Sequence, residues 1–339
     1  MAKDYSSLGL DAFLQSTSSL LSQNQLSAYQ VDSQNEPSAG AIDYSRITST
    51  GRTYQALVSL SKTGGAFTDI QSAINHVSRL GGGNILVSPG TYLISSEVTL
   101  ASNIGIEGVG NRRSIFEFNS GTVGFVSPGT AISIRNLVFQ NSLGTVFNFT
   151  GTPVVAGLDI KIENCFFDAN TACIYGTNVD NFRIQNNTGN GCVDFVTIDT
   201  SKAAGVFITG NFMGESLSGR NFIKINNGTS VMIENNYIFS DSRGTSIVTL
   251  GTSNRCMLVG NGFIWGATGG TSTDGIKLIN SDFNAMTGNA IVSGNAGTCY
   301  AVNISDTTSG SNVVVGNYLK GFTAQTNNLG TGNVIANNA

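Results

Sequence analysis

Hydrophobic and polar residues alternate in short runs over most of the chain. From residue 131 onward one pattern repeats: an aliphatic residue, any residue, Asn or Gly, and in most copies a further Asn. The third position of this pattern falls at residues 136, 164, 186, 210, 235, 260, 288, 316 and 337. The pattern therefore returns about every 25 residues, which indicates a repeat architecture whose units bury their apolar faces by stacking on one another.

A second alternating run lies between successive copies of the pattern. Its members are Val196–Ile198, Ile223–Ile225, Val248–Leu250, Ile276–Leu278 and Val302–Ile304. Strands this short cannot bury a face alone, but coiling the chain stacks each on its equivalent at about 4.8 Å. The repeat therefore predicts an all-β parallel β-helix with two or three strands in each coil. The aliphatic residues predicted to fill one buried column are Ile162, Ile184, Ile208, Ile233, Leu258 and Val314.

The residues at the turns fit the same architecture. The chain has 37 Asn and 42 Gly, and both tolerate left-handed backbone, while an Asn amide can also bond the Asn of the next coil. Proline would remove a ladder hydrogen bond, and none occurs after Pro153.

The segment before the repeats predicts a capping helix over residues 69–80. Thr68 stands three residues before Gln71, the spacing of a capping box. Ile70, Ala73, Ile74, Val77 and Leu80 share one face, and Gly81–Gly83 end the helix. The helix is expected to cover the first coil of a domain spanning residues 49–339. Residues 1–48, rich in Ser and Gln, are expected to be a solvated tail or an arm that orders against a partner.

Three runs carry a resemblance to a known family: Phe67–Ile74, Gly81–Tyr92 and Leu100–Gly110. They resemble the opening of the pectate-lyase-like right-handed parallel β-helix superfamily, which includes phage tailspikes and pectin-degrading enzymes. The resemblance implies one right-handed β-helix over residues 55–338. It does not imply one activity, because the superfamily holds lyases, hydrolases, epimerases and non-catalytic virion proteins. The paired-Asp motifs of polygalacturonases and a match to the pectate-lyase calcium site are missing.

Charge and composition narrow the function classes. Charged residues make up 11% of the chain, the net charge is −4 and the pI is ≈ 5.0, so no nucleic-acid partner is expected. No apolar run reaches 18 residues and the N-terminus lacks an apolar leader segment, so neither a membrane span nor a signal peptide is expected. The five Cys predict buried free thiols, and the single His76 argues against His-based chemistry. No metal and no cofactor are expected.

The candidate chemistry lies in the segments that follow the turns. Glu215, Asp241 and Trp265 stand five or six residues after the turn positions 210, 235 and 260. Arg220 and Arg243 belong to the same segments. Two carboxylates facing one groove are the requirement of glycoside cleavage, so Glu215 and Asp241 are the candidate catalytic pair, with Arg220, Arg243 and Trp265 as substrate-binding residues. A surface ion-pair cluster with a packed Trp is the alternative interpretation.

A second outward column is expected beside the alternating strands. It holds Asp194, Asn221, Ser246, Asp274 and Tyr300, next to Thr197, Lys224, Thr249, Lys277 and Asn303. Asp194 and Asp274 are three coils apart, about 14 Å by strand spacing, too far to act on one bond. The column predicts either a polar binding face or a solvated surface. Cys165 and Cys192, nearly one coil apart, are expected inside the core rather than at a metal.

These observations predict a virion structural protein of a bacteriophage: a tail spike, fibre or head-decoration protein assembled in the host cytoplasm. Bacterial surface polysaccharide is its candidate ligand. A homotrimer is expected, because an outer surface of Ser, Thr and Asn carries little charge to oppose association. Residues 1–48 would attach it to other virion proteins. The alternative function is a polysaccharide depolymerase, either a hydrolase or a lyase. A secreted adhesin-like β-helix is a third hypothesis, disfavoured by the missing signal peptide.

Overall fold

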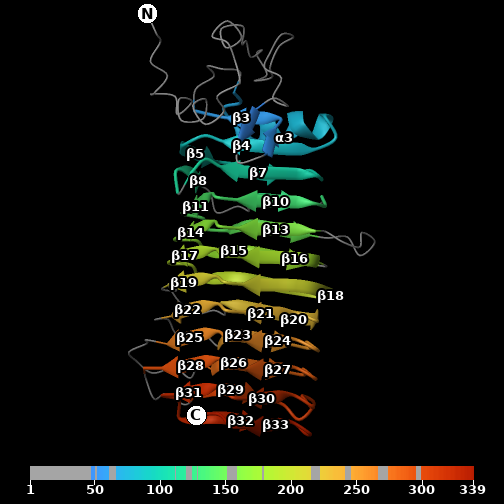
Figure 1. The fold of residues 1–339 in the computed structure, drawn as a ribbon, viewed down its shortest axis with the longest axis vertical. Helices are drawn as coiled ribbons and strands as arrows, with labels where there is room; N and C mark the ends of the chain where they lie inside the picture. Colours follow the sequence, from blue (N-terminus) through green and yellow to red (C-terminus); the bar gives the residue numbers. More distant parts are fainter. Residues whose placement is uncertain are drawn as a thin grey trace, which may run out of the picture.

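The chain forms a right-handed parallel β-helix, in agreement with the sequence prediction (Figure 1). The structure is a computed structural model, and it describes residues 47–49, 52–60, 66–110, 112–119, 124–127, 129–150, 159–177, 179–214, 222–240, 246–265, 274–294 and 299–339. Residues 1–46, most of the predicted arm, lie outside the described residues. The last two residues of that arm, Ile47 and Thr48, lie in β1 (Ile47–Ser49), which pairs antiparallel with β2 (Arg52–Tyr54).

Each full coil contributes three strands, and every pairing between coils is parallel. One series follows the predicted turn pattern: β3 (Ala56–Val58), β4 (Gly83–Val87), β7 (Ile104–Gly108), β10 (Ile132–Arg135), β13 (Ile160–Glu163), β16 (Asp180–Gln185), the second half of β18 (Asp194–Thr209), β21 (Met232–Glu234), β24 (Met257–Val259), β27 (Ala285–Thr287), β30 (Val313–Val315) and β33 (Val334–Ala336). We call it the turn-pattern series.

A second series holds the intervening alternating runs, and we call it the alternating series. It comprises β6 (Val98–Thr99), β9 (Phe125–Ser127), β12 (Thr145–Thr150), β15 (Ala172–Thr177), the first half of β18, β20 (Ile223–Thr229), β23 (Ser246–Gly251), β26 (Asp274–Ile279), β29 (Tyr300–Ile304) and β32 (Ala324–Asn328). Because β18 runs through both series, the two are joined in one 21-stranded sheet.

The third series forms a separate 10-stranded sheet with one strand in each coil. It comprises β5 (Gly90–Ile94), β8 (Ser114–Phe118), β11 (Val138–Gln140), β14 (Phe166–Asp168), β17 (Thr188–Asn190), β19 (Phe212–Gly214), β22 (Tyr237–Ser240), β25 (Gly262–Trp265), β28 (Ala290–Ser293) and β31 (Tyr318–Lys320). We call it the third sheet.

The predicted aliphatic column runs through the centre of the solenoid. Ile162, Ile184, Ile208, Ile233, Leu258 and Val314 are all fully buried. The strand register places Ile208 directly between Ile184 and Ile233, one coil on either side. Side chains on this column therefore touch their own equivalents, which is how strands of three or four residues share one continuous core.

The core changes in character along the axis. Its N-terminal half is filled by Phe rings that contact each other across coils, among them Phe116, Phe125, Phe139, Phe147 and Phe167. The C-terminal half is mostly Ile, Leu and Val. The five Cys are free thiols and are buried, as predicted. Burial raises the pKa of the Cys165 thiol to about 12.

The left-handed backbone and the amide ladder occur at two adjacent turn positions, whereas the sequence analysis placed both at one position. The third position of the pattern adopts the left-handed conformation, with φ of 53° at Asn235 and 63° at Gly260. The fourth position holds a ladder of amides that is buried in every coil but the last: Asn187, Asn211, Asn236, Asn261, Asn289, Asn317 and Asn338. The Oδ1 of each accepts bonds from the coil before, and its Nδ2 donates to a main-chain carbonyl.

Helix α3 (Ile70–Arg79) covers the N-terminal coil, as predicted (Figure 1). Its cap differs from the prediction, because the side chain of Asp69 rather than Thr68 accepts from Ser72 N, at 2.8 Å. The amide of Gln71 instead bonds the main chain of Thr99 in β6, accepting from its N–H at 2.7 Å and donating to its carbonyl at 3.2 Å. Leu80, expected on the buried face, is the C-cap and is 60% exposed.

Candidate functional site

The outward side of the alternating series is polar over many consecutive coils, and we call it the polar face. Register places one column along it: Asn148, Tyr175, Thr197, Lys224, Thr249, Lys277, Asn303 and Asn327. The predicted alignment of Thr197 through Asn303 is therefore confirmed. Alternation explains it, since the flanking residues, such as Ile223 and Ile225 beside Lys224, point into the core.

Asp274 is the best-anchored carboxylate on the polar face. It is 7% exposed and pairs in register with Ser246. Its Oδ1 accepts from Tyr300 N at 3.0 Å, and its Oδ2 accepts from Asn303 Nδ2 at 2.7 Å. Asn303 in turn accepts from Asn327 Nδ2 at 2.9 Å. These bonds fix the amides at the C-terminal end of the face, so their orientation is set before any ligand arrives.

A second acidic position lies nearer the N-terminal end of the face. Asp199 accepts from Asn226 Nδ2 at 3.2 Å and is exposed. Burial, and then the negative charge of Asp199, raise the pKa of the Tyr175 phenol above its usual value. Tyr175 therefore stays a neutral hydroxyl near neutral pH. Together the face offers hydroxyl, amide, ammonium and carboxylate groups at the spacing of the strands.

Four of the five candidate site residues lie outside the described residues: the catalytic candidates Glu215 and Asp241 and the substrate-binding candidates Arg220 and Arg243. Their flanking strands are described. Phe212 and Met213 pair in register with Tyr237 and Ile238, so β19 and β22 end at the same edge of the third sheet. Glu215 directly follows β19 and Asp241 directly follows β22. The pair itself stays a prediction.

Trp265 is described through its backbone, as the last residue of β25. It pairs with Ser240 on one side and Ser293 on the other. The segments after β19, β22, β25 and β28 each lead to the first residues of the polar face in the next strand, including Ser246, Asp274 and Tyr300.

The sequence analysis missed an ionic cluster near the N-terminal end of the turn-pattern series. Arg135, 6% exposed, lies between Glu107 and Glu163, with Nη2 at 2.9 Å from Glu107 Oε2 and Nη1 at 3.7 Å from Glu163 Oε1. Lys161 Nζ contacts Glu163 Oε2 at 2.7 Å, and Tyr54 donates its hydroxyl proton to Glu107. The sequence contained a signal for this cluster. Arg135 and Glu163 directly precede turn positions 136 and 164, so two opposite charges occupy the same repeat position in successive coils.

Two further features concern ligands and membranes. Within the described ranges, no three His, Cys, Asp or Glu side chains are grouped so that they could hold a metal ion. No helix in the part of the chain that the structure describes is long and apolar enough to cross a membrane.

No protein-family model matches the chain, and no curated protein matches it in sequence. A solved structure from Geobacillus virus E2, ORF18, is similar over 78% of this chain and 56% of its own, with 18% identity and a TM-score of 0.56. The A-module of the mannuronan C-5 epimerase AlgE6 from Azotobacter vinelandii is similar over 80% of this chain and 93% of its own, with 15% identity and a TM-score of 0.46.

The tailspike protein of Acinetobacter phage vB_ApiP_P1 is similar over 92% of this chain and 64% of its own, with 14% identity and a TM-score of 0.46. This chain thus spans less than two thirds of both viral proteins. At these identities the likeness is one of fold.

Proposed function

We propose that the chain is a virion structural protein of a bacteriophage, a tail spike, fibre or head-decoration protein, that presents its β-helix to bacterial surface glycan. The observation that carries the proposal is the polar face. Its hydroxyl, amide and ammonium groups recur at one strand spacing, about 4.8 Å, so a polymer with a short repeat meets similar partners coil after coil. The ORF18 protein of Geobacillus virus E2, which shares the fold, supports a viral origin for the chain.

The test is binding of the purified protein to polysaccharide extracted from the surfaces of a panel of bacteria. A variant carrying Lys224→Ala and Lys277→Ala removes two ammonium groups from the polar face and is expected to bind the matching polysaccharide at least about tenfold more weakly. The control carries Lys161→Ala and Lys320→Ala, which change the same charge on the other two strand series. Equal binding by both variants would contradict the role of the polar face.

A depolymerase is the second candidate function, favoured by the shared edge at which β19 and β22 end. In this proposal Glu215 and Asp241 act as the carboxylate pair, and Arg220, Arg243 and Trp265 hold the glycan beside the polar face. The release of reducing ends or unsaturated uronates from a bound polysaccharide tests it. Glu215→Gln and Asp241→Asn should each abolish release while leaving binding intact. Binding without release by the unaltered protein would leave the structural role alone.

The proposed assembly is a homotrimer whose residues 1–48 contact other virion proteins. Leu and Phe at residues 8, 10, 13, 14, 20 and 21 supply apolar groups for that contact. Light scattering on the full chain and on a shortened chain beginning at Ser45, which keeps β1, measures how far the arm contributes to self-association. In intact particles the arm should resist protease. Monomers from both chains, together with rapid cleavage of the arm in particles, would contradict this assembly.

A further inference from the structure

An insertion at one corner of the solenoid reaches across several coils. Residues 109–113 join β7 to β8, whereas residues 164–165 suffice between β13 and β14. Within the insertion Arg112 has a φ of 56°, a left-handed conformation unusual for a long side chain. Its Nη2 donates to Thr188 Oγ1 at 3.2 Å. Thr188 begins β17, three strands from β8 in the third sheet, so Arg112 spans about 14 Å of the corner.

The insertion encloses a hollow of ≈ 520 Å³. The Arg112 guanidinium carbon lies 3.9 Å from the centroid of the Phe166 ring, which forms part of the wall. Three amides also line the hollow, those of Asn136, Asn164 and Asn186. They stand at the third turn position on consecutive coils, so they repeat at one strand spacing along the wall.

The fold does not require amides at these three positions. Gly takes the same left-handed conformation at residues 210, 260, 288 and 316, with φ between 63° and 67°. The buried ladder belongs to the next position along the chain, so removing a third-position side chain leaves it intact. Asn136 Nδ2 donates to Glu107 Oε1 at 3.2 Å. Its side-chain carbonyl oxygen and the amides of Asn164 and Asn186 give the hollow hydrogen-bonding capacity that the turns themselves do not use.

The hollow is cationic. Arg112 is the only charged residue among those that line it. In the described part of the chain Arg112 has no carboxylate partner, because Glu107 and Glu163 contact Arg135 and Lys161 instead. A guanidinium carries five N–H donors in a planar fork that matches the oxygens of a carboxylate or a phosphate. One of those donors is engaged with Thr188, so the group retains capacity for an anion.

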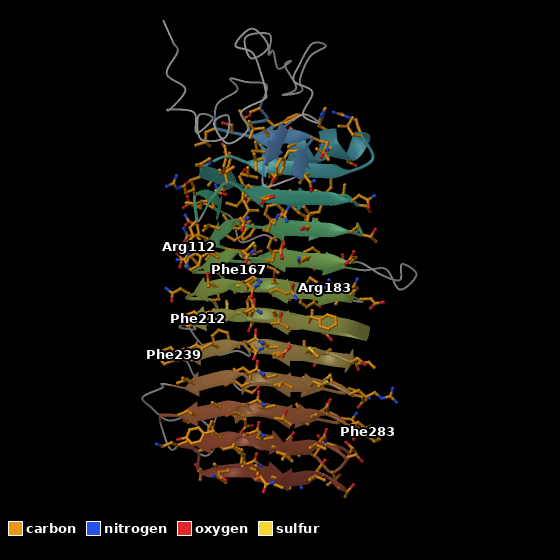
Figure 2. The ribbon with its side chains drawn as sticks, in the orientation of Figure 1. Arg112, Phe167, Arg183, Phe212, Phe239 and Phe283 are labelled. Atoms are coloured by element: carbon orange, nitrogen blue, oxygen red, sulfur yellow. The ribbon has the colours of Figure 1, made fainter. Side chains whose placement is uncertain are left out.

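An aromatic shelf continues from the hollow along the same edge. Phe166, Thr188, Phe212 and Tyr237 occupy the same outward position of successive strands. The rings of Phe212 and Tyr237 are stacked, with centroids 5.2 Å apart and planes 4° apart, and they are 51% and 40% exposed. Figure 2 shows Arg112 and Phe212 on one long edge of the solenoid, beside the third sheet. Exposed aromatic faces of this kind accept the apolar side of a sugar ring.

We propose that the hollow and the shelf form a binding edge for an anionic saccharide, with its carboxylate or phosphate at Arg112, its hydroxyls on the Asn amides and its following rings on Phe212 and Tyr237. This inference rests on the proposed glycan contact but not on the polar face. The edge lies on the third sheet and the adjacent corner, and none of its residues belongs to the polar-face column.

The test is calorimetry on the full chain with three ligands. They are trigalacturonate, the same trisaccharide with its carboxyl groups reduced to hydroxymethyl, and a trisaccharide bearing one phosphate. Arg112→Gln should weaken binding of at least one of the two acidic ligands, the carboxylate or the phosphate, by about tenfold or more. It should leave the affinity for the neutral ligand unchanged. Arg113→Gln is the matched control, because it removes an equal charge from the neighbouring residue, which does not line the hollow.

Two further variants separate binding from folding. Asn164→Gly keeps a residue that suits the left-handed turn and should lower affinity without lowering the unfolding midpoint. Phe212→Ser should lower affinity for trigalacturonate but leave binding of monomeric galacturonate, added as a fourth ligand, unchanged. Equal effects of Arg112→Gln and Arg113→Gln, or no binding of either acidic ligand, would overturn the inference. If Phe212→Ser changes only the sedimentation of the protein, the shelf is a contact between copies of the chain and the saccharide edge is wrong there. If the variant with Lys224→Ala and Lys277→Ala loses binding of surface polysaccharide while Arg112→Gln retains it in full, the proposed function stands and this site is wrong.

Discussion

At the scale of single residues, two neighbouring turn positions with similar side chains have opposite environments. Asn235 has left-handed backbone and lies at the surface, whereas Asn236 is 1% exposed and fully bonded. Its Oδ1 accepts from the N–H and Nδ2 of Asn211, and its own Nδ2 donates to the Ile208 carbonyl. The same amide is therefore exchangeable at one position and essential at the next.

Replacing Asn236 by Ala should lower the free energy of unfolding by at least about 2 kcal/mol, because buried donors on Asn211 and the Ile208 carbonyl lose their partners. Asn235→Gly is the matched control, and it should change stability by less than about 1 kcal/mol, since Gly stands at the equivalent position in neighbouring coils. Denaturant unfolding of both variants measures the difference. Equal losses would show that the ladder carries no special stability.

Replacing Ile208 by Ala tests the central column at one residue. Ile208 is fully buried between Ile184 and Ile233, so the truncation leaves a cavity that the rigid coils on either side cannot fill. The free energy of unfolding should fall by about 2–5 kcal/mol. Phe207→Ala, on the same strand with its side chain outward, should cost less than half as much in the same denaturant titration.

At the scale of elements, the ionic cluster links three adjacent strands of the turn-pattern series. Arg135 on β10 joins Glu107 on β7 to Glu163 on β13. Arg135→Met would leave two mostly buried carboxylates without their shared cation, and should lower the free energy of unfolding by about 3–5 kcal/mol. Arg183→Met, an exposed residue two strands along, should cost less than about 1 kcal/mol. Thermal unfolding at neutral pH compares them, and a similar shift for both would contradict the cluster's contribution.

The strands were predictable and the site was not, for a physical reason. The inward column around Ile208 could be derived because alternation forces every second side chain inside, and a repeat of constant length fixes the register between coils. Arg112 reaches Thr188 over 76 residues through an insertion that breaks the repeat. No periodicity reports where an inserted side chain ends, so the corner hollow is visible only in three dimensions.

The same limit applies to the predicted catalytic pair. Glu215 and Asp241 were chosen by counting from the turns, and the strands before them pair in register. Counting cannot give the direction of a side chain beyond the last paired residue. The predicted helix cap at Thr68 was wrong for a related reason, because the Gln71 side chain bonds β6, a strand 28 residues away, and so cannot close a capping box.

At the scale of the whole molecule, the outer surface changes along the axis. One outward column of the turn-pattern series begins with polar residues, Ser133, Lys161 and Arg183. It then becomes apolar over the remaining coils, with Phe207, Met232, Met257, Ala285, Val313 and Val334 in register. Met257, Val313 and Val334 are 44%, 37% and 52% exposed. A continuous exposed apolar stripe is typical of a surface that meets another protein.

The last prediction is that this stripe holds the protomers of the proposed trimer side by side. A stripe parallel to the axis on a flat sheet fits a neighbour lying in the same direction, which brings the N-terminal ends of all copies together for attachment. Met257→Lys combined with Val313→Lys places two charges in the contact, where they cannot be solvated. Light scattering should then give one chain mass, 35.3 kDa, where the unaltered protein gives three.

Ser133→Lys is the control, because it adds a lysine to the polar end of the same column and should leave the mass at three chains. The double variant should remain folded and unfold cooperatively, since both positions point away from the core. Its unfolding midpoint should be lower than that of the trimeric control, because association stabilises the folded chain. An unchanged mass for the double variant would mean that copies associate through another face, and the aromatic shelf at Phe212 and Tyr237 would then be the next surface to alter.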